Sequence, residues 1–158
     1  MSGFGALVRS AVPVADLPTI AARATHAHDV RYASGWRNAL MEIPDFFDEA
    51  ELADGLIRDT GAPVITMYVL DTWAIAIAVS PAGVRRRFFV NERLALLEYE
   101  DMPVQPEFTN EDALADLLRW AGEARLTPDS ARLAGVLADG DADARTFRSQ
   151  LAAALGMW

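Results

Sequence analysis

Two histidines, His26 and His28, have the H-x-H spacing that can bind a metal ion or serve in acid–base chemistry. This spacing places both imidazoles on one side of the chain only where the segment is extended. In a helix the two side chains point about 200° apart and cannot share an ion. Because the alanines between Ala21 and Ala27 favour a helix, we expect no metal site here.

Three adjacent arginines, Arg85, Arg86 and Arg87, lie in a segment with the composition of a β-strand; we call them the arginine strand. Alternation puts Arg85 and Arg87 on one face and Arg86 on the other. We expect an edge strand that its charge protects against aggregation. The alternative is an anion or ligand site, since guanidinium groups suit carboxylate and phosphate. The other residues that would line such a pocket are Trp36, His26 and His28.

Acidic residues gather in two stretches that contain no basic residue: six acids within residues 38–57 and seven within residues 94–118. Some of them complement the dipole at the start of a helix. The others would create a negative field that speeds the encounter with a cationic partner. The acids expected to bind such a partner are Glu98, Glu100, Asp101, Glu107, Asp45, Asp48 and Glu49.

Two adjacent aromatic residues, Phe46 and Phe47, lie between Asp45 and Asp48. Aromatic side chains framed by acids can anchor a protein interface that has a polar rim. The alternative is a hydrophobic contact at the start of a helix, because Asp48 and Glu51 have the spacing of a capping box. Both phenylalanines therefore join the candidate partner-binding residues, with the helix contact as the simpler explanation.

The composition excludes several classes of function. The chain has 158 residues, 23 of them acidic and 14 basic, and a net charge of −9. General nucleic-acid binding is excluded, because phosphate binding needs a basic face. The absence of cysteine excludes disulfides, thiolate zinc sites and cysteine nucleophiles. All 14 basic residues are arginine, which is typical of a high-GC bacterial gene. No catalytic motif occurs, so we expect no cofactor.

These residues are expected to lie in one α+β domain that spans residues 1–158. Residues 1–62 are predicted to be helical, with one helix that begins after Asp48 and ends at Gly61. Residues 109–156 are predicted to form three helices, since their apolar residues recur at helical spacing. The N-terminal and C-terminal helices would flank the sheet.

The sheet is predicted within residues 63–100, as an antiparallel meander of three or four strands. Residues 64–70, 73–79 and 84–90 have strand-like composition and are joined by short turns. Residues 93–99 fit either a fourth strand or a short helix. In residues 73–79, large residues alternate with alanine. We therefore expect both faces of the sheet to be covered, with the alanine face allowing a helix to approach closely.

Together these features predict a non-catalytic acidic domain that binds a protein partner with a basic surface. Small inhibitors of the immunity type have this size and charge, and they cover the basic cleft of a toxin with carboxylates. One alternative is a secretion or assembly chaperone, which would use a hydrophobic groove on a dimer. The other is a small-ligand-binding protein or enzyme built on the arginine strand.

The sequence also indicates where such a domain would act. The N-terminal segment lacks the apolar run of a signal peptide. The longest apolar stretch is shorter than the roughly 20 residues that a membrane-spanning helix needs. We therefore expect a cytoplasmic location without membrane contact, and the sequence leaves open whether the chain forms a homodimer.

Overall fold

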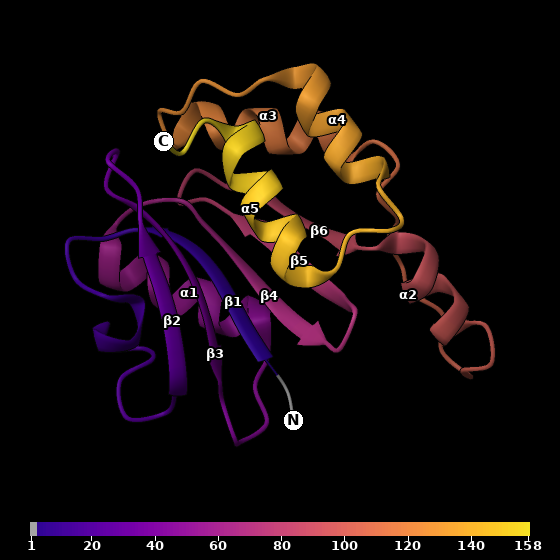
Figure 1. Ribbon diagram of the computed structural model, residues 1–158, viewed down its shortest axis with the longest axis horizontal. Helices are drawn as coiled ribbons and strands as arrows, with labels where there is room; N and C mark the ends of the chain where they lie inside the picture. Colours follow the sequence, from indigo (N-terminus) through magenta and orange to yellow (C-terminus); the bar gives the residue numbers. More distant parts are fainter. Residues whose placement is uncertain (1–2) are drawn as a thin grey trace.

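A computed structural model describes residues 3–158 as a six-stranded antiparallel sheet with helices on both faces (Figure 1). The strands are β1 (Gly3–Arg9), β2 (Thr25–Arg31), β3 (Trp36–Glu42), β4 (Val64–Leu70), β5 (Trp73–Val79) and β6 (Arg85–Val90). The helices are α1 (Glu49–Thr60), α2 (Glu92–Tyr99), α3 (Ala113–Glu123), α4 (Ser130–Ala138) and α5 (Ala144–Leu155), with a 3-10 helix, η1 (Val14–Asp16). Within these residues, no helix is long and apolar enough to cross a membrane.

Two separate apolar layers lie on opposite faces of the sheet, whose strand order is β2-β3-β1-β4-β5-β6. On one face, Ala74, Ala76 and Ala78 of β5 lie under α3, α4 and α5. On the other face, Ile77 and Val79 of the same strand belong to the layer that contains α1 and η1. The expectation that both faces are covered is confirmed, and the small alanine side chains lie beneath helices as predicted.

The C-terminal half of the chain has the elements that the sequence predicts. Strands β4, β5 and β6 form the antiparallel meander, and residues 109–156 contain the three helices α3, α4 and α5. The segment that fitted either a strand or a helix is a helix, α2. It begins after Asn91, whose side chain accepts a hydrogen bond from the backbone N–H of Leu94. Asn91 has a φ of 55°, a left-handed conformation that asparagine tolerates better than most residues.

The prediction that residues 1–62 are helical is wrong for most of that segment. It forms β1, β2 and β3, so the sheet has six strands instead of three or four. Strand β1 is central, and both of its faces are buried: Phe4 and Val8 face α1, and Leu7 faces the opposite layer. Such a strand shows no alternation of polar and apolar residues, and periodicity alone does not distinguish a short apolar run from a buried helix.

Only α1 matches the N-terminal prediction, and it begins and ends as expected. The carboxylate of Asp48 accepts a hydrogen bond from the backbone N–H of Ala50 at 2.8 Å. Gly61 ends the helix with a φ of 70°, and its N–H donates to the carbonyl oxygen of Ile57. A left-handed residue at this position is a common helix end, and glycine adopts it without steric cost.

Candidate functional site

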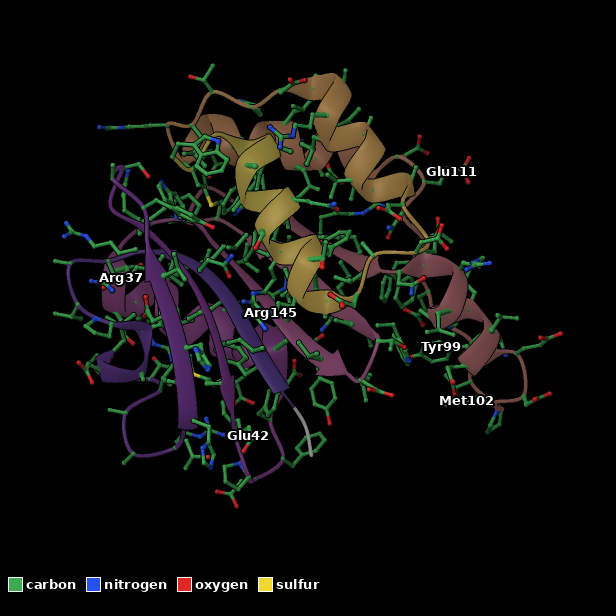
Figure 2. The ribbon with its side chains drawn as sticks, viewed as in Figure 1. Arg37, Glu42, Tyr99, Met102, Glu111 and Arg145 are labelled. Carbon is green, nitrogen blue, oxygen red and sulfur yellow. The ribbon has the colours of Figure 1, made fainter. Side chains whose placement is uncertain are left out.

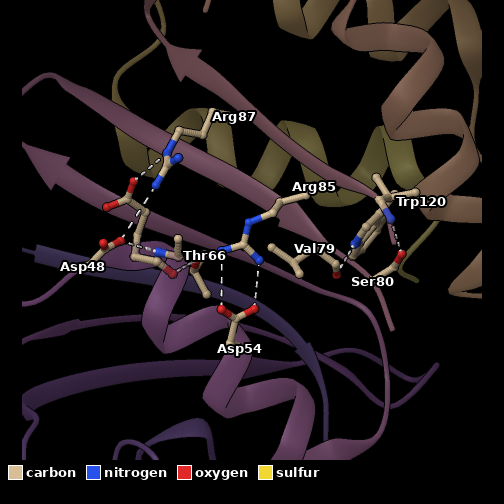
Figure 3. A network of polar contacts seen from close by, with 11 residues as sticks. Asp48, Asp54, Thr66, Val79, Ser80, Arg85, Arg87 and Trp120 are labelled. Atoms are coloured by element: carbon tan, nitrogen blue, oxygen red, sulfur yellow. Dashed lines mark hydrogen bonds and ion pairs between the residues drawn. The ribbon is translucent and has the colours of Figure 1, made fainter. Parts of the chain in front are cut away.

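The arginine strand lies at one edge of the sheet, as the sequence favours, because β6 is the last strand in the order. The guanidinium of Arg85 holds the carboxylate of Asp54 on α1 with two contacts of 3.0 and 3.3 Å (Figure 3). This hydrogen bonding raises the pKa of Arg85 above its ordinary value. Arg87 lies 3.4 Å from Glu49 and 3.9 Å from Asp48. Helix α1 thus neutralises this face of the strand.

Arg86 points to the opposite face of β6, as strand alternation predicts. Its Nη2 donates to the carbonyl oxygens of Thr109 and Glu111, at 2.9 and 2.7 Å. Its Nη1 lies 3.4 Å from the carboxylate of Asp116 on α3. A hollow of about 480 Å³ lies beside the strand, and Glu107 adds a carboxylate to its lining. An anion would have to displace existing partners here, so the contacts favour internal neutralisation of the strand.

The other residues of the alternative ligand pocket lie far from the arginine strand in the fold. Trp36 is buried against Trp120, with ring centroids 5.7 Å apart. His26 and His28 lie on β2, at the opposite edge of the sheet, so the helix expected there is wrong. His26 sits at an irregularity of the strand with a φ of 51°, and its Nε2 is 4.0 Å from Glu42. Across residues 3–158, no cluster of three or more metal-binding side chains occurs.

The candidate partner-binding residues at the start of α1 mostly serve the fold. Asp48 caps the helix and faces Arg87, and Glu49 is only 8% exposed. Phe47 is buried edge-on against Phe4, with ring centroids 5.6 Å apart. Their neighbour Phe46 is 89% exposed, and Asp45 is exposed beside it. Only Asp45 and Phe46 therefore remain fully available to a partner in this segment.

The second acidic stretch begins in a projection that we call the arm: residues 92–109, which comprise α2 and the loop after it. Figure 1 shows α2 standing away from the sheet at one end of the molecule, and Figure 2 places Met102 near the tip. Four of its acids are exposed and form no ion pair within the described residues: Glu98, Glu100, Asp101 and Glu107. Its exposed apolar side chains are Leu96, Leu97, Met102 and Val104.

The inner side of the arm packs against the body through aromatic rings. Tyr99 lies edge-on to Trp73 at 5.9 Å and tilted on Phe89 at 6.2 Å, measured between ring centroids. Phe108 stacks on Phe89 at 4.4 Å, and Ala95 is buried in the same cluster. This cluster attaches the arm to the sheet, while the exposed apolar side chains of the arm point elsewhere.

Asn110 joins the two ends of the arm to the edge of β6. Its side-chain Nδ2 donates to the carbonyl oxygens of Phe89 and Leu137 at 2.8 and 2.9 Å. Its Oδ1 accepts from the backbone N–H of Phe89 at 2.5 Å. Its own N–H donates to the carboxylate of Glu92, in the first turn of α2. The sequence reasoning missed Asn110, because a single asparagine in a loop belongs to no motif.

The structure thus separates the predicted site residues into three groups. Glu98, Glu100, Asp101 and Glu107 share the arm, whereas Asp48, Glu49 and the three arginines pair with one another or with other parts of the fold. The aromatic and imidazole residues of the ligand pocket are dispersed. No protein-family model, curated protein or solved structure matches the chain. Function therefore has to be inferred from these sites.

Proposed function

We propose that the chain binds a protein partner with a basic surface through the arm and acts as an inhibitor that masks this surface. One observation carries the proposal: unpaired carboxylates and exposed apolar side chains share a single projection. If the arm exposed only acidic side chains, their effect on solubility would be enough to explain them. Leu97 and Val104, however, are 57% and 74% exposed beside those acids. Clustered apolar exposure of this kind is typical of a protein interface.

The two kinds of side chain would have different tasks in the complex. The carboxylates would attract a basic partner and raise the association rate. The apolar side chains would supply most of the affinity from the centre of the contact, within a polar rim. Because Asn110 holds both ends of the arm, little conformational entropy would be lost on binding.

As an inhibitor of the immunity type, the chain would place its carboxylates where the partner binds phosphates or another anionic substrate. The partner is then a nuclease or another toxin with a cationic active-site cleft. The net charge of −9 supports this assignment, because long-range attraction adds to the local contacts.

The test is affinity capture with the immobilised chain at about 50 and about 500 mM NaCl. We expect a basic protein to bind at low salt and to be lost at high salt, because screening weakens the exposed charges. A variant that neutralises the arm should lose this protein at both salt concentrations. Its substitutions are Glu98→Gln, Glu100→Gln, Asp101→Asn and Glu107→Gln.

A matched control removes the same charge from exposed acids outside the arm. Its substitutions are Asp16→Asn, Glu51→Gln, Asp71→Asn and Asp112→Asn. If the control loses the partner and the arm variant keeps it, the arm is not the interface. If a partner stays bound at high salt and both variants still bind it, the result would instead favour the chaperone alternative, because a chaperone binds its partner through an apolar surface. Adding the wild-type chain to the purified partner should abolish the partner's own activity. This result distinguishes an inhibitor from a protein that only binds the partner.

A further inference from the structure

The two edges of the sheet differ in how their backbone groups are covered. At the β6 edge, the side chain of Asn110 binds both the N–H and the carbonyl oxygen of Phe89, and the arginine strand precedes this residue. Such features protect an edge strand against pairing with another chain. At the opposite edge, β2 has an irregularity at His26, but its residues 28–31 pair regularly with β3. The β2 edge is therefore the one at which a further strand can be added.

The outer backbone groups of β2 belong to Asp29 and Arg31. The N–H of Tyr32 donates to the carbonyl oxygen of Trp36 across the β2–β3 hairpin. Because hydrogen-bonded and non-hydrogen-bonded pairs alternate in an antiparallel ladder, Asp29 and Arg31 point their N–H and carbonyl groups away from β3. Within the described residues, no backbone–backbone hydrogen bond outside the sheet uses these groups. They are available to a strand that lies alongside β2.

One face of β2 also exposes apolar side chains. Val30 is 57% exposed, and it lies on the same face as Tyr32, two residues further along. The ring of Tyr32 contacts Trp158, which is 67% exposed, at 5.8 Å between centroids. In Figure 1, helices α3, α4 and α5 leave β2 clear. Exposed apolar side chains beside an unpaired strand edge are typical of a contact with another chain.

We propose that two copies of the chain pair through β2, antiparallel and about a two-fold axis at Val30, and so form one continuous sheet. In this register, Asp29 of each copy lies opposite Arg31 of the other, and each such pair exchanges its backbone hydrogen bonds. Val30 then faces Val30 of the second copy in a non-hydrogen-bonded pair, where side chains approach most closely. Arg31 is exposed and forms no ion pair in the part of the chain that the structure describes, so the dimer gives it an acidic neighbour.

Charge and hydrogen bonding select this register over its neighbours. An axis at Asp29 would place two carboxylates opposite each other, and an axis at Arg31 would do the same with two guanidinium groups. An axis between two residues would set the outward groups of one copy against residues that point inward on the other, so the backbone bonds would not form. The carboxylate of Asp29 already accepts from Val14 and Arg37, but its lone pairs suffice for about four hydrogen bonds.

The overall negative charge does not oppose this contact strongly. Residues 28–32 contribute one acid and one arginine, so the paired segments are neutral. The arm packs on Trp73 and Phe89 of β5 and β6, at the edge opposite β2. The unpaired acids of the two arms therefore lie at the far ends of the joined sheet, where salt screens their repulsion. The dimer does not depend on the function of the arm, and it would present two arms at once.

The test is the molar mass in solution, measured by sedimentation equilibrium over a range of concentrations. We expect the wild-type chain to approach twice the mass of one chain as its concentration rises. Val30→Lys and Val30→Glu should each remain monomeric, because two like charges would meet at the axis. An equimolar mixture of these two variants should recover the dimer, since opposite charges then face each other. Only a register with its axis at Val30 predicts this recovery.

Leu97→Lys is the matched control, because Leu97 on the arm is also 57% exposed, and this variant should remain dimeric. Hydrogen exchange covers the case in which the substitutions at Val30 disturb the strand. In the wild-type chain, exchange at the amides of Asp29 and Arg31 should slow as the concentration rises. A wild-type chain that stays monomeric up to about 1 mM would overturn the proposal. So would a dimer that persists in Val30→Lys, a mixture that stays monomeric, or a dimer that Leu97→Lys dissociates.

Discussion

At the scale of single residues, the buried arginines differ in how their charge is balanced. Arg37 and Arg148 are both at most 9% exposed. Arg37 forms an ion pair with Asp29 and donates to the carbonyl oxygens of Ser10 and Ala11. Arg148 has only neutral acceptors. Within the described residues, the charge of Arg37 is therefore paired with a carboxylate, whereas that of Arg148 is not.

Replacing Asp29 by asparagine should destabilise the fold by about 3 kcal/mol. The carboxylate lies 3.1 Å from Arg37 and accepts a hydrogen bond from the N–H of Val14 at 2.7 Å. The two side chains of the pair are 10% and 13% exposed, so removing one charge leaves the other buried and unpaired. Urea unfolding measures the change in the free energy of unfolding.

The matched control for this prediction is Asp54→Asn, at the exposed pair with Arg85. Its side chains are 49% and 44% exposed, so solvent screens the interaction, and we expect a loss of less than about 1 kcal/mol. Equal losses in the two variants would show that burial does not strengthen the Asp29–Arg37 pair.

At the scale of elements, one side chain, Asn110, forms hydrogen bonds at both ends of the arm. Asn110 bonds to β6, to the end of α4 and to the start of α2. It therefore occupies the outer edge of β6 much as a further strand would. The aromatic cluster beneath the arm adds packing, but these hydrogen bonds fix where the arm begins and ends.

Asn110→Ala should lower the free energy of unfolding by about 2–3 kcal/mol, because it leaves buried backbone groups of Phe89 and Leu137 without partners. We expect faster hydrogen exchange across residues 92–109 and little change in β1 and β4. Gln105→Ala is the control, since the amide of Gln105 bonds only to exposed carbonyl oxygens within the arm itself. Uniform acceleration in all elements would contradict a local role for Asn110.

The elements also show how far the sequence could predict this fold. Helix α1 was predictable because Asp48 and Gly61 mark its ends by local chemistry. Strand β3 was not, since a run from Trp36 to Met41 that is buried on both faces carries no period of two. Composition therefore identifies the interior strands β4 and β5, which are rich in β-branched residues, and it misses β3, which contains none.

The same limit applies to the candidate site. The exposed acids of the arm could be found as a charge cluster, because they make no long-range contact. The pairing of Asp54 with Arg85 could not, since 31 residues separate them and only the packing of α1 on the sheet brings them together. Asn110 and Arg148 form buried contacts with strands that are distant in the sequence, and no local sequence pattern indicates such contacts.

At the scale of the whole molecule, the sheet lies between two cores that share its strands. Strand β5 contributes Ala76 to one core and Ile77 to the other. The stability of each layer therefore depends on the sheet, because both layers pack against it. We expect the described residues to unfold in one cooperative transition.

Ala76→Leu should destabilise the protein by about 2 kcal/mol, because extra carbons between β5 and the helices above it force the layers apart. Ile77→Val, one residue along the strand and on the opposite face, should cost about 1 kcal/mol through a lost methyl group. Both variants should keep a single unfolding transition in urea, followed by far-UV circular dichroism and by tryptophan fluorescence. Two separate transitions would show that the layers are independent.

The central position of β1 has a consequence for how the chain folds. Of the six strands, β1 comes first in the sequence, yet its two neighbours lie much later: β3 begins at Trp36 and β4 at Val64. The β2–β3 hairpin and the β4–β6 meander can each form from local contacts. They join only when β1 is inserted between them, and such long-range pairing is slow. Until then, β1 exposes two unpaired edges and two apolar faces, so the nascent chain is most prone to aggregation before β4 emerges.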